Sequence, residues 1–273
     1  MKYLPIDNDL FIQNRKRLVA LLKPNSIAVF NSNDQMPTSA DGQHPFIQQT
    51  DLFYLSGIDQ EESTLVICPG IKEEKHREIL FLKETNERIA LWEGHKYTRE
   101  EGRAAAGIKT VYWNHEFNDI FKQLVLQSDN IYLNTNEHLR ANAAVETRDN
   151  RFLRWCRRAF PLHNYQRLAP IMHGLRAVKS QPELDLIQNA CNITDRTFRR
   201  LLGFIKPGVW EFEIEAEITA KLLRSGAEIL EAPIRYEPRE EGKKLTPWDG
   251  LPTLGKLIAC RFWQPVTNTV SPN

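Results

Sequence analysis

One short apolar run constrains the fold of this chain more than any other stretch. Residues 26–30 read Ser-Ile-Ala-Val-Phe, and they follow an amphipathic pattern over residues 10–22 that Lys23-Pro24 interrupts. Apolar residues at helical spacing around the basic stretch Arg15 to Arg17 predict a first helix with one polar face. A strand that is apolar throughout has no face for water and must be covered on both sides. The run therefore predicts a sheet covered on both faces.

Strand and helix signals alternate along the following residues. Three short runs, over residues 63–68, 77–82 and 88–92, are separated by turn residues and predict neighbouring antiparallel strands. Thr98 and Glu101 have the spacing of a capping box, which predicts a helix that ends at Gly107. The pattern then predicts a strand over 110–113, a helix over 117–126, a strand over 130–133 and a helix over 149–159. Such alternation is typical of α/β proteins.

A polar stretch carrying Asp51 leads into an aromatic run. The residues Leu52-Phe-Tyr-Leu55 are strand formers and predict a strand that ends at Ser56-Gly57. Local sequence leaves two interpretations of Asp51. It caps a turn through its own backbone, which is the common role of such an aspartate, or it faces a binding partner.

The residues from 180 onward predict two helices. Ser180-Gln-Pro-Glu183 has the spacing of a capping box, and apolar residues over 184–202 form a seam along the helix that follows. Lys206-Pro-Gly208 ends that helix, and a second one continues to about Gly226. Alternate acids between Glu211 and Glu217 lie at its start, where they favour the positive end of the helix. No histidine stands at ligand spacing from them, so we do not assign them to a metal.

Composition narrows the classes of partner. The formal net charge is +1, so no basic footprint for nucleic acid is expected. No stretch approaches the ~20 apolar residues of a membrane span, and the start of the chain has no hydrophobic signal region. The four cysteines are scattered without a paired motif, which is typical of small buried side chains in a reducing compartment. We therefore expect a cytoplasmic protein.

Four stretches carry a family resemblance. They are residues 46–58, Ala90-Leu-Trp-Glu-Gly94, Leu175-Arg-Ala-Val-Lys-Ser180 and residues 205–218. Together, and in this order, they resemble the Xaa-Pro aminopeptidases, the aminopeptidase P branch of the creatinase and prolidase family. The resemblance implies a creatinase-type α/β amino-terminal domain, with a mixed sheet flanked by helices, in residues 1–165. It implies that residues 166–226 hold a linker and the first two helices of an incomplete α+β pita-bread domain.

The resemblance also implies site residues and partners. Asp51 and Trp92 match positions that approach the family's substrate pocket, which takes peptides with proline at the second position. The family's reaction releases the residue before proline and uses two divalent metals, typically manganese, held by two Asp, two Glu and one His. No residue of this chain matches those ligands, so we expect no catalytic residue, no metal ligand and no bound cofactor. The expectation is a truncated metallopeptidase that is inactive alone.

An alternative expectation is a non-catalytic module. In the family, amino-terminal domains edge the active site of a neighbouring subunit. The resemblance therefore implies a homo-oligomer, or pairing with an intact aminopeptidase subunit to which this chain contributes Asp51 and Trp92.

The remaining residues, 227–273, carry a different resemblance. Arg235-Tyr-Glu-Pro-Arg239 precedes Glu241-Gly-Lys-Lys244 and an Asp249-Gly250 pair. This order resembles the end of the catalytic domain in dolichyl-phosphate-mannose-synthase-like glycosyltransferases. The nucleotide-sugar site of such enzymes has no match in the chain, so a glycosyltransferase remnant is a further alternative. The change of resemblance beside Gly226 suggests a fusion, a deletion product or an assembly artefact.

Overall fold

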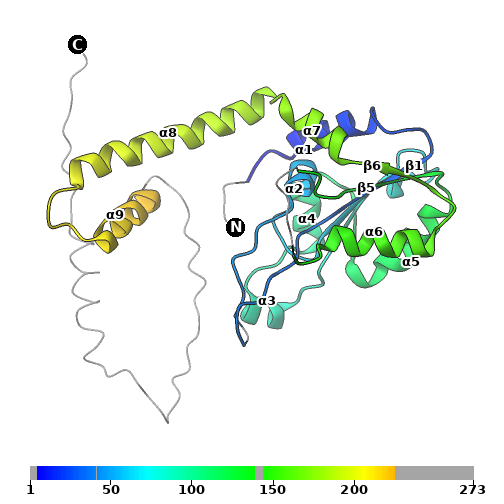
Figure 1. Cartoon of the computed structure of the whole chain (residues 1–273), viewed down its shortest axis with the longest axis horizontal. Helices are drawn as coiled ribbons and strands as arrows, with labels where there is room; N and C mark the ends of the chain where they lie inside the picture. Colours follow the sequence, from blue (N-terminus) through cyan, green and yellow to red (C-terminus); the bar gives the residue numbers. More distant parts are fainter. Residues whose placement is uncertain (1–4, 41, 139–143, 225–273) are drawn as a thin grey trace, which may run out of the picture. The chain divides into compact units, whose positions relative to one another are not determined.

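The structure is a mixed sheet between helices. The computed structural model describes residues 5–40, 42–138 and 144–224. Within these ranges a six-stranded sheet has the order β4-β3-β2-β1-β5-β6 (Figure 1). Its strands are β1 Ser26–Asn31, β2 Thr64–Ile67, β3 Glu78–Leu82, β4 Thr110–Trp113, β5 Asn130–Leu133 and β6 Asn164–Arg167. β2 pairs antiparallel with β1 and β3, and the other pairs are parallel. The predicted mixed sheet is confirmed.

Helices connect most of the strands. They are α1 Asn8–Val19, α2 Thr50–Ser56, α3 Glu87–Glu93, α4 Arg99–Ala106, α5 Phe117–Val125, α6 Arg148–Ala159, α7 Ala169–Ala177, α8 Gln181–Phe204 and α9 Glu211–Arg224, with short 3-10 turns at Glu74–His76 and Asn114–Glu116. Over the described ranges, no helix combines the length and the apolar character that crossing a membrane requires.

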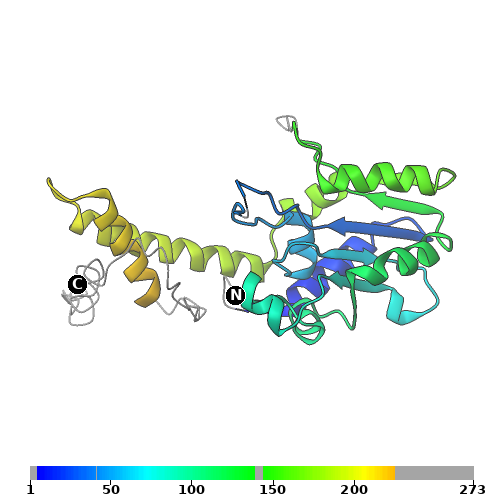
Figure 2. The same cartoon turned by 90° about the horizontal axis from the view of Figure 1, so that it is seen from below.

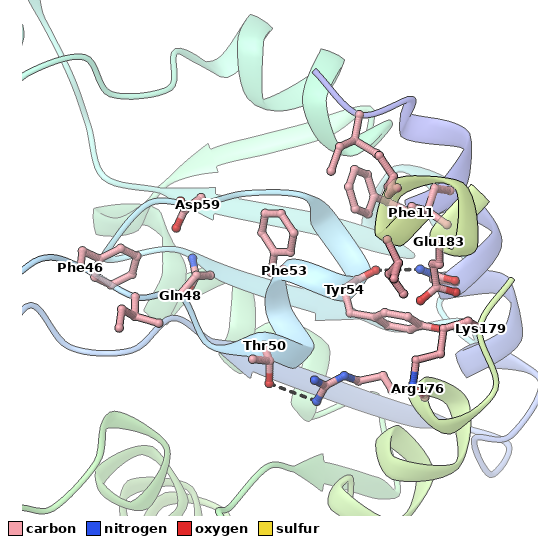
Figure 3. Close-up of a pocket in the computed structure, with 16 residues that line it drawn as sticks. Phe11, Phe46, Gln48, Thr50, Phe53, Tyr54, Asp59, Arg176, Lys179 and Glu183 are labelled. Carbon is pink, nitrogen blue, oxygen red and sulfur yellow. Dashed lines mark hydrogen bonds between the residues drawn. The ribbon is translucent and has the colours of Figure 1, made fainter. Parts of the chain in front are cut away.

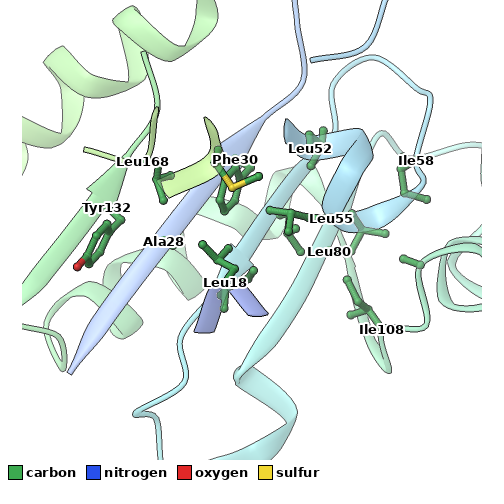
Figure 4. Packing of buried hydrophobic residues seen from close by; sticks show 14 of the residues in the cluster. Leu18, Ala28, Phe30, Leu52, Leu55, Ile58, Leu80, Ile108, Tyr132 and Leu168 are labelled. Atoms are coloured by element: carbon green, nitrogen blue, oxygen red, sulfur yellow. The ribbon is translucent and has the colours of Figure 1, made fainter. Parts of the chain in front are cut away.

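The apolar side chains of β1 contribute to the core on both faces of the sheet. Ala28 and Phe30 join one buried cluster together with residues of α1, α2, α4 and α7 (Figure 4). Ile27 and Val29 join a second cluster together with residues of α5 and α6. Successive side chains of a strand point to opposite faces, so each pair meets a different helical layer. Figure 1 shows α5 and α6 on one side of the strands and α1 and α7 on the other, and Figure 2 shows the same domain turned by 90°. The prediction of a strand covered on both sides is confirmed.

A buried arginine, Arg15, joins α1 to α2 and α4, three helices of the layer that packs against Ala28 and Phe30. The side chain of Arg15 is fully buried, although it stands in the basic stretch of the first helix. Its guanidinium donates to the carbonyl oxygens of Leu55 at 2.7 Å and Ala106 at 2.9 Å, near the carboxyl ends of α2 and α4. It also donates to Glu78 Oε2 at 2.9 Å. Carbonyl groups at helix ends lack partners within the helix, and Arg15 supplies donors to them, which accounts for its burial.

The predicted strand over Leu52 to Leu55 is a helix. Gln49 caps α2, because its side-chain oxygen accepts from the backbone N–H of Asp51 at 2.6 Å and of Leu52 at 2.9 Å. Gly57 ends α2 with φ of 68°, in the left-handed conformation that glycine adopts readily. Leu52 and Leu55, three residues apart, are both buried, which is the spacing of one helix face.

The predicted strand over residues 88–92 is also a helix. Asn86 begins α3 by accepting from the backbone N–H of Ile89 at 3.0 Å. Both predicted capping boxes are confirmed, at Thr98 before α4 and at Ser180 before α8.

The core continues past residue 165. β6 and α7 were not predicted, because the sequence pattern indicates only a linker before the helix that begins at Ser180. Leu168, Met172 and Leu175 are nevertheless buried in the first cluster. Further along, Phe198 and Leu202 of α8 are 61% and 76% exposed, so the predicted seam is largely uncovered in this structure.

The cysteines divide between two environments. Cys68 and Cys156 are buried and free, as predicted. Cys191 is exposed, which the sequence did not predict. Cys260 and the predicted end of α9 at Gly226 lie outside the described residues.

Candidate functional site

Asp51 lies in the first turn of α2 and is held from two sides. Its Oδ1 accepts from Arg176 Nη1 of α7 at 2.8 Å. Its Oδ2 accepts from Asn134 Nδ2, just after β5, at 2.8 Å and from Gln49 Nε2 at 3.4 Å. The side chain of Asp51 is only 10% exposed. Of the two interpretations drawn from local sequence, the turn cap is wrong, since Gln49 performs that task.

A largely apolar cavity of about 630 Å³ opens beside this network (Figure 3). Its lining includes Ile6, Leu10, Phe11, Asn14, Phe46, Ile47, Gln48, Thr50, Phe53, Tyr54, Asp59, Arg176, Lys179, Glu183, Leu186 and Ile187. Thr50 and Arg176 belong to the wall, whereas Asp51 is not among the lining residues and contacts Arg176. Arg176 Nη1 also donates to Thr50 Oγ1 at 3.1 Å, and this bond is drawn in Figure 3. Asp51 therefore positions Arg176 at the cavity wall.

Tyr54 fixes the same wall to α1 and α7. Its hydroxyl accepts from Arg17 Nη1 at 3.2 Å and donates to the carbonyl oxygen of Leu175 at 3.3 Å. Burial raises the pKa of Tyr54 above its ordinary value, so the hydroxyl keeps its proton at neutral pH. Its ring is thus held as a rigid apolar surface with its polar end satisfied.

The residues that line this cavity are suited to binding a ligand. Apolar side chains with a few fixed polar groups are typical of sites that bind small molecules or peptide segments. Arg176 and Lys179 supply positive charge, and Asp59 and Glu183 supply negative charge. This mixture suits a ligand with an apolar body and charged or polar ends.

The other predicted site residue is described only in part. Trp92 lies in α3, and its side chain is outside what the structure describes. Asp51 and Trp92 thus come from separate helices, α2 and α3.

The described residues do not fit the metal centre implied by the family resemblance. Among them, no three His, Cys, Asp or Glu side chains lie together in a way that could hold a metal ion. We therefore derive no chemical step through a metal in this part of the chain.

Sequence reasoning missed the partners of Asp51. Asn134 and Arg176 are separated from it by 83 and 125 residues, so no local pattern connects them. Arg176 stood inside one of the four resembling stretches, but its role was not predicted. The capping role of Gln49 was also missed, although Gln49 is a polar residue that stands directly before the helix over residues 50–56.

Comparison with known proteins shows what this domain is similar to. The family "Aminopeptidase P, N-terminal domain" matches residues 11–132. The Xaa-Pro aminopeptidase of Escherichia coli (strain K12) is 24% identical over 223 residues, which cover 81% of this chain and 50% of that protein. A solved structure described as an aminopeptidase P from Bacillus anthracis has a TM-score of 0.71 and 25% identity, and the match covers 81% of this chain and 52% of that one. The aminopeptidase P of Escherichia coli in its low pH form has the same fold, with a TM-score of 0.67 and 22% identity over 81% of this chain and 50% of that chain.

The described sheet and helices therefore form a creatinase-type α/β domain. Residues 11–132 of it match the aminopeptidase P amino-terminal domain, as the resemblance implied, and the similar curated proteins are described as Xaa-Pro aminopeptidases. The chain spans about half the length of the curated relatives it matches.

Proposed function

We propose that this chain forms the substrate-bordering part of an Xaa-Pro aminopeptidase site. The observation that carries the proposal is the match of residues 11–132 to the aminopeptidase P amino-terminal domain, together with a shared fold over 81% of the chain. Peptides with proline at the second position are the proposed ligands. In this proposal the chain binds and orients peptide, and release of the first residue depends on ligands that the described residues do not contain.

Asp51 takes part in this function through Arg176. The carboxylate of Asp51 is already engaged by Arg176 and Asn134, whereas Arg176 and Thr50 line the cavity. A guanidinium held by a carboxylate keeps a fixed direction and still has further N–H donors. We therefore propose Asp51 as a positioning residue, Arg176 as the group that meets the peptide, and Trp92 as a second substrate-facing residue.

The first experiment tests whether the chain alone is catalytic. The purified full chain is incubated with manganese or zinc and a peptide with proline at the second position, and release of the first residue is measured. We expect no release, and manganese-dependent release would overturn the proposed inactivity of the chain alone.

The second experiment tests whether the chain acts as a module that borders the active site of a neighbouring subunit. The chain is co-expressed with an intact aminopeptidase P subunit, and the mixed assembly is purified and assayed. If the chain borders the neighbour's site, Arg176→Gln should raise KM about tenfold, the effect of losing one charge-assisted hydrogen bond, with little change in kcat. The control Arg167→Gln changes an exposed arginine outside the cavity lining and should leave KM unchanged. Failure to co-purify, or equal effects of both variants, would contradict the proposal.

The glycosyltransferase alternative concerns residues 227–273, which lie outside the described residues. It predicts that the chain binds a nucleotide sugar or a polyprenyl phosphate. Titration of the full chain with either ligand tests it, and lack of binding would remove it.

A further inference from the structure

A second cavity, on another side of the domain, has a different chemistry. It encloses about 680 Å³ between the end of β1, the start of β2, α5 and α6. That volume lies within the range of small-molecule sites. β1 and β5 are parallel, and their carboxyl ends are the edge of an α/β sheet where ligands commonly bind.

Arg148 is the central cation of this cavity. Its Nη1 donates to Ser32 Oγ at 2.5 Å and its Nη2 donates to Thr64 Oγ1 at 3.1 Å. Thr64 Oγ1 in turn donates to Asn31 Oδ1 at 3.2 Å. Ser32 follows β1 and Thr64 begins β2, so two neighbouring strands hold the guanidinium in one orientation.

Within the part of the chain that the structure describes, the charge of Arg148 has no contacting counter-ion. The ion pairs formed among residues 5–40, 42–138 and 144–224 do not include it, whereas Arg151 pairs with Asp34 at 2.6 Å. Burial lowers the pKa of Arg148, although more distant carboxylates oppose this shift. A partly desolvated guanidinium that donates only to neutral hydroxyls is stabilised by an anion that replaces its lost hydration.

The rest of the lining restricts which anion fits. Asp34 and Glu62 also line the cavity and balance the charges of Arg148 and Arg151, so the lining has no surplus of positive charge for phosphate or another multiply charged anion. Phe117, Phe152 and Trp155 form an apolar wall facing the same space. The ligand must therefore combine a single negative charge with an apolar body.

We propose that this cavity binds the α-carboxylate of an amino acid, or of the last residue of a peptide, with an apolar side chain. The carboxylate meets Arg148 through paired N–H donors, and the side chain lies against Phe152 and Trp155. The site does not depend on the proposed peptidase relationship, because it uses none of the residues around Asp51.

Isothermal titration of the unaltered full chain tests this assignment first. L-phenylalanine should bind saturably with a Kd on the order of 1 mM, as expected for so small a ligand. L-phenylalaninamide, which lacks the carboxylate, and inorganic phosphate should bind at least ~10-fold more weakly. The dipeptide Gly-Phe separates the two sources of the carboxylate: binding as tight as that of phenylalanine supports a peptide end, and weaker binding supports a free amino acid. Equal binding of the amide, tighter binding of phosphate, or no saturable binding of phenylalanine or Gly-Phe would overturn the proposal.

Variants then locate the site. Arg148→Gln should weaken phenylalanine binding about tenfold or more, and Arg148→Lys should weaken it less because a charge remains. Arg158→Gln, an exposed arginine on the same helix outside the lining, is the control and should bind as the unaltered chain does. Unchanged affinity in Arg148→Gln would overturn the assignment. Circular dichroism identifies a variant that does not fold, and in that case the amide comparison on the unaltered chain decides.

Discussion

Replacing Arg15 by methionine should destabilise the domain strongly. The arginine side chain is fully buried and donates to Glu78 and to the carbonyl oxygens of Leu55, Ala106 and Gly107 at 2.7–3.3 Å. Methionine fills much of the space but donates no hydrogen bond. The variant leaves three carbonyl oxygens without this donor and leaves Glu78 without its cation.

The expected loss follows from these contacts. Removing one partner of a buried ion pair costs about 3–5 kcal/mol, mostly because the remaining groups stay desolvated. The Glu78 side chain is 33% exposed and can recover part of its hydration, which favours the lower end of that range. For a domain of this size, about 3 kcal/mol lowers Tm by roughly 6–12 °C.

Urea unfolding followed by circular dichroism measures the effect directly. Arg158→Met is the control, because it removes an exposed arginine and should change the free energy of unfolding by less than about 0.5 kcal/mol. The double variant Arg15→Met with Glu78→Gln should cost less than the sum of the single changes, since the two groups interact. A loss below about 1 kcal/mol in Arg15→Met would refute the reasoning.

Three further predictions rest on single residues. Burial raises the pKa of Asp149 to about 6, so this group favours the folded state at low pH, and that contribution is lost as pH rises from about 4 through 6. Asp149→Asn keeps an acceptor for Asn31 and should raise the free energy of unfolding at pH 7.5 by up to ~3 kcal/mol, with little change at pH 4; equal effects at the two pH values in urea titrations would contradict this. Gly107→Ala should lower Tm measurably, because φ is +64° and the new Cβ would lie 2.7 Å from Cδ1 of Ile12; a Tm at or above that of the unaltered chain in thermal unfolding would contradict it. Thr98→Ala removes an N-cap and should cost about 1 kcal/mol in urea unfolding, whereas Thr98→Ser should cost less; an equal loss in both would show that the hydroxyl is not responsible.

Much of the sheet could be predicted from the sequence because strands β1, β2, β3 and β5 are buried almost throughout, whereas β6, which is half-buried or exposed, was not predicted. Residues 27–30 have no polar side chain, so the buried environment of this strand follows from its composition alone. The helix α2 could not be predicted in the same way. Leu52 to Leu55 suit either a strand or a helix, and the outcome depends on Gln49 accepting two backbone N–H groups and on Gly57 ending the turn.

The site was predicted less completely than the fold. Asp51 was singled out from the sequence as a substrate-facing residue, but the side chains that hold it, Asn134 after β5 and Arg176 of α7, lie far along the chain and were not predicted. The charge environment of Arg148 was not predicted at all, because it depends on hydroxyls from two strands that meet only in the folded sheet. Long-range pairing of polar groups leaves no periodic signal in a sequence.

The strand order has a consequence for synthesis of the chain. β1 is central, yet its parallel neighbour β5 lies about a hundred residues later, at Asn130–Leu133. At roughly 5–20 residues per second, a ribosome needs several seconds to supply β5 after β1 has emerged. During that interval one edge of β1 has no strand beside it, and such an edge can pair with other chains. We therefore expect slow translation before residue 130 to favour aggregation, and fast completion of β5 to favour folding.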